Sequence, residues 1–228
     1  HFCANKEFAN RLKKMGEQEF RIKTVGSPQL DELNLINDKK KKKDIFEELN
    51  IEKMKDYLLV AYHSVTEEFH KTQKNFDIFL RSLKLIDLPK IWILPNNDAG
   101  SNIIKSNVLK KRTNDIFIFD NINREKYLYL LKYASCIVGN SSSGIIEAPT
   151  FEVPCVNIGR RQNKRLRAKN VIDVLNYDEI KISRAIKRAI SKDFKTKLVN
   201  LKNPYGDGNS SNKIVEYLLN TKRDKKLF

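Results

Sequence analysis

Residues 135–149 read SCIVGNSSSGIIEAP, and this stretch decides the fold of the 228-residue chain. Its first part, SCIVGN, is a short apolar run that predicts a buried strand. Three serines and a glycine follow at once and predict a helix start, because small polar residues favour helix N-termini. A strand that passes directly into a helix is the repeating unit of a parallel sheet covered by helices.

The same strand-then-helix unit repeats on both sides of this stretch. The alternation predicts an α/β protein with a doubly wound, Rossmann-like parallel sheet of about six strands. Besides 135–140, the expected strands are DYLLVAYH (56–63), KIWILPN (90–96), DIFIFDN (115–121), PCVNIG (154–159) and NVIDVL (170–175). The expected helices cover 65–86, 103–109, 124–134, 141–151 and 178–194.

The start of the chain does not fit this alternation. Residues 1–40 predict a helix over 5–15 and a strand over 21–28, and we expect them to be the end of an N-terminal domain with its linker. Because a helical pattern begins almost directly after His1, we also expect the chain to be part of a longer protein.

The Rossmann-like domain is expected over 41–203, and the remaining residues, 204–228, form a separate C-terminal segment. Pro204 and two glycines interrupt the pattern, and a final helix follows through Leu219. We expect Ser210 or Ser211 to cap that helix. The helix is expected to pack back toward the N-terminal domain.

The composition is that of a folded protein. A hydrophobic fraction of 40% with 9% aromatic residues suffices for a packed core. No apolar run approaches the roughly 20 residues of a membrane span, and the first residues show no hydrophobic stretch of the signal-peptide kind, so we expect a soluble, cytoplasmic protein with no membrane partner. The cysteines at 3, 136 and 155 lack the spacing of a metal site, and we expect buried, reduced thiols and no bound metal.

The chain is strongly basic. Its 44 Lys and Arg against 28 Asp and Glu give a net charge of 44 − 28 = +16, and a pI near 9.7 makes nucleic-acid binding an alternative function. The lysines, however, are spread through most of the expected helices, and the run Lys39–Lys43 is typical of a solvated linker. No zinc finger, recognition helix or RNA-binding aromatic strand is present, so we predict no nucleic-acid partner.

Polar residues follow the expected strands, where open α/β sheets bind their ligands. They predict a ligand cleft at the carboxyl edge of the sheet. In chain order these residues are His63, Asn96 with Asp98, Asn121, Asn140–Ser143 and Arg160–Gln162.

The densest cluster is GNSSSGIIEAP, at 139–149. Its hydroxyls and the N–H groups of a helix start suit a phosphate or diphosphate, and Glu147 can accept two hydrogen bonds from a vicinal diol such as a ribose. An ordinary serine-capped helix explains the same residues equally well. Arg160 and Arg161 can pair with phosphate oxygens or be plain surface arginines, and His63 is the one histidine at an expected strand end.

Six segments together resemble the UDP-N-acetylglucosamine 2-epimerase family. The most specific is VGNSSSGIIEAPTFEVPCVNIGRRQ (138–162), and all six occur in the family's order over nearly the whole chain. NSSSGIIEAP followed by NIGRRQ resembles the hydrolysing branch, which acts in sialic-acid-type sugar biosynthesis. The other five segments are RIKTVGSPQLD, AYHSVTEE, LPNNDAGS, AKNVIDV and NPYGDGNSS.

The resemblance implies a fold and an activity. The fold is the C-terminal domain of a two-domain glycosyltransferase-B type, which holds most of the nucleotide. The activity is hydrolysing 2-epimerisation of a UDP-N-acetylated sugar, with elimination of UDP, a glycal intermediate and addition of water. The substrate's UDP moiety is then the bound nucleotide, no separate cofactor is needed, and the full-length enzyme is expected to be a homo-oligomer.

The resemblance also implies roles for individual residues. Ser141 and Ser142 contact the diphosphate, Glu147 binds the ribose, and Arg161 lies on the nucleotide side of the cleft. The other implied residues are Asn96, Asn121 and Ile122 on the uridine side and, as a catalytic residue beside the sugar or its phosphate, His63.

One departure from the family limits the expected activity. The carboxylates that move protons at the sugar belong to the family's N-terminal domain, so we expect these 228 residues to bind UDP weakly and not to catalyse. A UDP-sugar-dependent glycosyltransferase of the same fold is a further alternative, because a fold does not fix a chemistry.

Overall fold

The computed structural model describes residues 1–36, 42–51, 54–110 and 113–221, without the side chains of 34 and 35. The chain divides into two compact units. One comprises 38–202 and holds the large sheet, and the other combines 1–37 with 203–228. Of the expected linker Lys39–Lys43, the first three residues lie outside the described part, and Lys42 begins a helix.

The large unit contains a six-stranded, fully parallel sheet in the order β5-β4-β3-β6-β7-β8. This confirms the predicted α/β, doubly wound fold and all six of its strands. The order reverses between β3 and β6, which is where sheets of this kind open a crevice for a ligand. The strands are β3 (Leu58–Ala61), β4 (Lys90–Ile93), β5 (Ile116–Phe119), β6 (Cys136–Gly139), β7 (Cys155–Ile158) and β8 (Val171–Val174).

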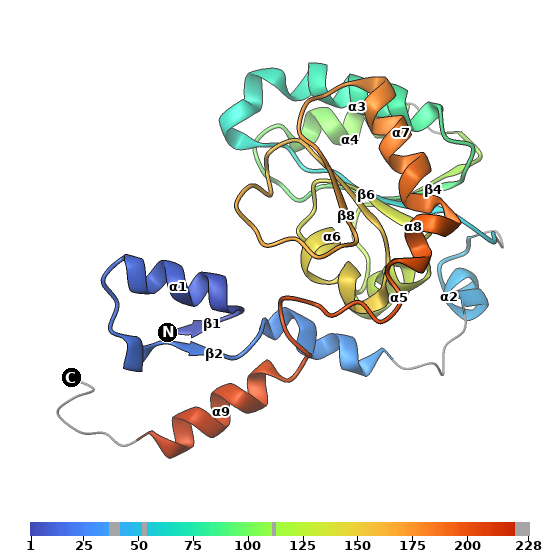
Figure 1. Cartoon of the computed structure of the whole chain (residues 1–228). Coiled ribbons are helices and arrows are strands. Elements are labelled where there is room, and N and C mark those ends of the chain that lie inside the picture. The colour runs from blue at the N-terminus through green and yellow to red at the C-terminus, as the bar shows by residue number, and fades with distance from the viewer. Residues whose placement is uncertain (37–41, 52–53, 111–112, 222–228) are drawn as a thin grey trace. The chain divides into compact units, whose positions relative to one another are not determined.

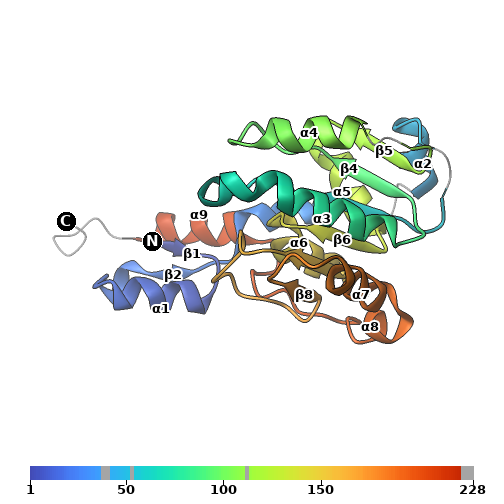
Figure 2. The same ribbon diagram turned by 90° about the horizontal axis from the view of Figure 1, so that it is seen from above.

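Helices cover both faces of this sheet (Figures 1 and 2). One face carries α3 (Thr72–Lys84), α4 (Ser101–Lys110) and α7 (Glu179–Ile190), and the other carries α5 (Arg124–Tyr133), α6 (Ser143–Ile146) and the 3-10 helix η4 (Ala148–Phe151). The remaining helices of the unit are α2 (Lys42–Glu48), η3 (Thr66–Lys71) and α8 (Lys192–Thr196).

The expected helix over 65–86 is in fact two helices. Residues 66–71 form η3, and α3 begins only at Thr72. Glu68 has φ −113° and ψ 23°, outside the helical range, so the backbone kinks there and a single α-helix cannot form.

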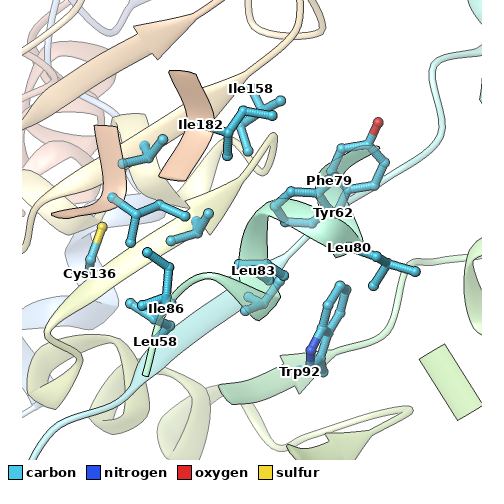
Figure 3. Packing of buried hydrophobic residues seen from close by; sticks show 14 of the residues in the cluster. Leu58, Tyr62, Phe79, Leu80, Leu83, Ile86, Trp92, Cys136, Ile158 and Ile182 are labelled. Carbon is cyan, nitrogen blue, oxygen red and sulfur yellow. The ribbon is translucent and has the colours of Figure 1, made fainter. Parts of the chain in front are cut away.

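The core lies between the sheet and the helices α3, α4 and α7. Alternate strand residues such as Leu58 and Val60 point to this face, as the period of two in a strand requires. Tyr62 stacks on Phe79 with ring centroids 4.9 Å apart, and Trp92 meets Phe79 edge-on at 5.9 Å (Figure 3). Each such side chain contributes roughly 1.5–3 kcal/mol on burial.

The three cysteines are buried and unpaired, as predicted. Burial raises the pKa of the Cys136 thiol to about 12, so this sulfur stays protonated and unreactive. Among the helices of the described residues, none is both long and apolar enough for a membrane crossing.

The small unit is built on a two-stranded parallel sheet. Here β1 (Phe2–Cys3) pairs with β2 (Lys23–Thr24), and α1 (Lys6–Lys14) is capped by Asn5, whose side chain accepts from the Phe8 N–H at 3.0 Å. The unit also holds the 3-10 helices η1 (Glu19–Arg21) and η2 (Pro28–Leu35) and the last helix, α9 (Ser210–Asn220).

The predicted serine cap of the last helix is wrong. Ser210 and Ser211 lie inside α9, and Asn209, the N-cap residue, turns its side chain to Asn212 at 2.6 Å. The cap comes instead from Asp31 in η2, whose carboxylate accepts from the N–H groups of Ser210 at 2.8 Å and Ser211 at 2.7 Å. A charged carboxylate satisfies two free helix N–H groups at once, which one serine hydroxyl does not do.

Candidate functional site

The candidate site lies where the strand order reverses, at the carboxyl ends of β3 and β6. The residues that follow these strands are tied together by one side chain. Asn140 is fully buried, its Oδ1 accepts from the His63 N–H at 2.7 Å, and its Nδ2 donates to the His63 carbonyl at 2.8 Å. The amide thereby replaces the backbone pairing that ends where the two strands diverge.

A third strand end is joined to the same point. The backbone carbonyl of Asn140 accepts from Gln162 Nε2 at 2.8 Å and from Arg161 Nη1 at 3.2 Å. Both donors belong to the loop after β7. The polar loops after β3, β6 and β7 therefore form one connected structure, as the cleft prediction requires.

His63 is held against the loop after β4. Its Nδ1 lies 3.3 Å from Asn96 Oδ1. Burial, and then the positive charge of Arg161, lower the pKa of the imidazole, and the Asn96 contact offsets only part of this. His63 is therefore neutral at pH 7 and can either donate or accept a hydrogen bond.

Two hollows open at the carboxyl edge of the sheet, one lined by His63 and the other by the next residue, Ser64. The first, which we call the β4–β5 hollow, has a volume of about 540 Å³ and is lined by His63, Ile93–Asn97, Lys105, Asp120–Ile122, Arg124 and Tyr127. The second, the arginine hollow, has a volume of about 560 Å³ and is lined by Ser64–Glu68, Asp98, Ser142, Arg160–Gln162 and Arg165.

The two hollows adjoin one another along the chain at two places. His63 lines the first and Ser64 the second, and in the same way Asn97 lines the first and Asp98 the second. An elongated ligand can therefore place its two ends in different hollows and its middle beside His63.

The serine-rich turn reaches this boundary. Ser142 lines the arginine hollow, and Ser141 is half-buried, with its Oγ 3.4 Å from the Ser143 N–H. The turn can approach the sheet closely only because Gly139 has no side chain. Its φ is +140°, and a Cβ there would lie 2.1 Å from the Ala61 carbonyl oxygen.

Glu147 is more buried than expected for a carboxylate that binds the diol of a ribose. Its side chain is fully buried, one carboxylate oxygen accepts from Arg124 Nη2, and the other accepts from Ser143 Oγ at 2.6 Å. Tyr127 in turn donates its hydroxyl to Ser143 Oγ at 2.6 Å. Arg124 has a side-chain exposure of 39% and separates the carboxylate from solvent on the side of the β4–β5 hollow.

The structure brings most of the predicted site residues to these two hollows. Ser141 and Glu147 line neither, and they support the site from the serine turn and from behind Arg124. The β4–β5 hollow is lined by His63, Asn96, Asn121 and Ile122, and the arginine hollow is lined by Ser142 and Arg161.

Some residues of the site were missed as individual positions. Asn140 and Gln162 were noted only as polar strand-end residues, and Tyr127 and Arg124 only as parts of a helix. Arg124 could have been noticed, because a cation in the first turn of a helix opposes the helix dipole and is out of place without a partner. Nothing in the sequence links Tyr127 to Glu147.

The arginine hollow combines both signs of charge. Arg160, Arg161 and Arg165 are donors for phosphate oxygens, while Glu67, Glu68 and Asp98 accept from hydroxyl or amide groups. Such a set suits a ligand that carries both phosphate and polyol parts. Among the described residues, no three His, Cys, Asp or Glu side chains are grouped as a metal would require.

Comparison with known proteins identifies the family that this fold and site belong to. The sequence profile of the family described as UDP-N-acetylglucosamine 2-epimerase matches residues 1–219. The chain belongs to this family, and the predicted resemblance to it is confirmed.

Two similar curated proteins are named as hydrolysing enzymes. The GDP/UDP-N,N'-diacetylbacillosamine 2-epimerase (hydrolyzing) of Campylobacter jejuni is 36% identical over 202 residues, covering 86% of this chain and 51% of that protein. The UDP-N,N'-diacetylbacillosamine 2-epimerase (hydrolyzing) of Legionella pneumophila is 33% identical over 221 residues, covering 96% and 56%. The chain thus spans about half the length of these curated relatives.

Solved structures share the fold at lower identity. The UDP-GlcNAc 2-epimerase of Neisseria meningitidis, bound to UDP-GlcNAc, superposes with a TM-score of 0.79 at 21% identity, covering 97% of this chain and 61% of that one. The UDP-GlcNAc 2-epimerase of Methanocaldococcus jannaschii, in complex with UDP-GlcNAc and UDP, gives a TM-score of 0.74 at 22% identity, with coverages of 96% and 60%.

Proposed function

We propose that this chain is the nucleotide-binding half of a hydrolysing 2-epimerase that acts on a UDP-N-acetylated sugar. The observation that carries the proposal is the meeting of the loops after β3, β6 and β7 through Asn140, with one hollow lined by His63 and another lined by Ser64. The relatives named as hydrolysing 2-epimerases support the same reaction class.

The two hollows suggest how the ligand lies. The uracil and ribose occupy the β4–β5 hollow beside Asn96, Asn121 and Ile122. The diphosphate crosses the boundary at the serine turn, where Ser141 and Ser142 donate hydrogen bonds, and the sugar enters the arginine hollow. Arg161 stands at that crossing, because it already donates to the Asn140 carbonyl and lines the second hollow.

Glu147 can bind the ribose only if its hydrogen bond from Arg124 is broken. A vicinal diol that donates to Glu147 replaces the bond from Arg124, whose side chain is 39% exposed. Ser143 and Tyr127 keep the other carboxylate oxygen in place during this exchange.

The proposed reaction begins with anti elimination across C1 and C2 of the sugar. A base removes the C2 proton, the C–H electron pair forms the C1–C2 double bond, and the C1–O bond breaks with release of UDP. Negative charge develops on the β-phosphate, and hydrogen bonds from the serines, Arg161 and the His63 imidazole that strengthen with this charge lower the barrier. Water then adds to the glycal to give the free 2-epimeric sugar.

We assign the base that removes the C2 proton to residues outside these 228. The chain alone is then expected to bind UDP without turning over UDP-N-acetylglucosamine. The test is the rate of UDP release from that substrate by the purified chain, with a relative's full-length enzyme as positive control. Release above the background of heat-treated chain would contradict the assignment.

A further inference from the structure

The arginine hollow contains two buried polar atoms whose partners are missing. Ser64 is 4% exposed and Gln162 is 2% exposed, and both line this hollow. Within the described part of the chain, neither Ser64 Oγ nor Gln162 Oε1 has a hydrogen-bond partner. Buried polar atoms are nearly always paired in folded proteins, so each such exception calls for an explanation.

Local structure does not explain this pair. The Gln162 side-chain nitrogen donates to the Asn140 carbonyl at 2.8 Å. This hydrogen bond fixes the orientation of the side chain but does not use its amide oxygen. Ser64 directly follows His63 at the carboxyl end of β3, at the boundary between the two hollows. Ser64 Oγ and Gln162 Oε1 thus both belong to the loops that Asn140 joins.

The chemistry of the Gln162 amide oxygen excludes a phosphate as its partner. Gln162 Oε1 is an acceptor only, so it repels phosphate oxygens and needs an O–H or N–H donor. The arginines of the same hollow already supply the donors that a phosphate takes. A neutral group with its own donors, such as a sugar hydroxyl or an acetamido N–H, fits the acceptor side.

We propose that Ser64 and Gln162 are specificity residues that hydrogen-bond the sugar, and not the nucleotide, of the bound UDP-sugar. This inference rests on the proposed function and deepens it, because it assigns the recognition of an N-acetylated sugar to named atoms of this half of the enzyme. The hydroxyl of Ser64 donates or accepts, and the amide oxygen of Gln162 accepts.

The test compares the affinities of the chain for UDP and for UDP-N-acetylglucosamine by calorimetry. The unchanged chain is expected to bind the UDP-sugar more tightly than UDP. Ser64→Ala is expected to weaken UDP-sugar binding roughly five- to tenfold, the effect of about one hydrogen bond, while the Kd for UDP changes less than about twofold. Gln162→Met is likewise expected to reduce the difference between the affinity for UDP-N-acetylglucosamine and the affinity for UDP.

The chain offers a matched control. Ser183 is also 4% exposed, but its hydroxyl donates to the Ile180 carbonyl at 3.0 Å in α7. Ser183→Ala is expected to lower the melting temperature and leave both affinities unchanged. Ser64→Ala removes no side-chain hydrogen bond that the described residues make, so the melting temperature is expected to stay the same or rise while the affinity for the UDP-sugar falls.

The outcomes separate this inference from the proposed function. If the unchanged chain shows no binding of UDP, the proposed function itself is contradicted. If UDP binds but UDP-N-acetylglucosamine binds no more tightly, or if Ser64→Ala weakens both ligands equally or neither, the proposed function stands and the assignment of Ser64 and Gln162 to the sugar is overturned.

Discussion

At the scale of single residues, Asn140 holds the site together. Its side chain spans the point where β3 and β6 separate and fixes the His63 backbone, and its carbonyl anchors Gln162 and Arg161. The sequence indicated a polar residue here but not this role, because hydrogen bonds between loops more than 70 residues apart follow from the strand order and not from local spacing.

Removing the Asn140 side chain is expected to leave the N–H and carbonyl groups of His63, which are partly buried, without the partners that it supplies. Asn140→Ala should lower the free energy of unfolding by about 2–4 kcal/mol, measured by chemical denaturation. Asn96→Ala removes an exposed side chain of the same type and should change stability by less than about 0.5 kcal/mol. Equal losses from the two variants would contradict the bridging role of Asn140.

The lowered pKa of His63 predicts a pH effect on stability. The folded state disfavours protonation of this imidazole, so the unfolded chain binds the proton more readily. The stability that results is fully present above the ordinary histidine pKa of about 6.5 and is lost as the pH falls through the lowered pKa. Between pH 7.5 and pH 5, the melting temperature of the unchanged chain should therefore fall further than that of His63→Gln. An equal decrease in the two melting temperatures would contradict the prediction.

At the scale of elements, the sequence predicted the six strands because apolar runs of this length, set between amphipathic helices, have few other structures open to them. It did not predict the kink at Glu68 or the Asp31 cap, because these depend on backbone geometry and on contacts distant in sequence. The burial of Glu147 behind Arg124 was missed for the same reason, since α5 and α6 meet only in the folded sheet.

The close contact of β6 with β3 predicts that Gly139 tolerates no side chain. Gly139→Ala would place a Cβ 2.1 Å from the Ala61 carbonyl oxygen, at a positive φ as well. We expect a loss of more than about 3 kcal/mol in the free energy of unfolding, or no soluble protein. Gly16 also has a positive φ, of +96°, but open space around it, so Gly16→Ala should cost only about 1 kcal/mol.

The Asp31 cap predicts a local effect on α9. Desolvation raises the pKa of Asp31, but hydrogen bonds from Ser211 and Ser210 outweigh it and hold that pKa below its usual value. The cap is therefore at full strength above the usual pKa and is lost as the pH falls through the lowered one. Asp31→Ala should speed amide exchange in the first turn of α9 roughly fivefold, the effect of about 1 kcal/mol, and leave α7 unchanged.

At the scale of the whole molecule, the basic charge and the folded site point to different functions. A net charge of +16 fits nucleic-acid binding, whereas the joined strand ends and the two hollows fit a nucleoside diphosphate that carries a sugar. Family membership favours the nucleotide-sugar function over nucleic-acid binding. The two readings differ in ligand selectivity and in salt dependence, because binding through the general positive charge weakens steeply with salt.

The most direct measurement is a calorimetric titration of the chain with UDP, and with ADP as control, at low and high salt. We expect binding that favours UDP over ADP, persists at high salt and weakens markedly in Ser142→Ala. No response to UDP, together with salt-sensitive binding of DNA or RNA, would contradict a nucleotide site at the carboxyl edge of the sheet.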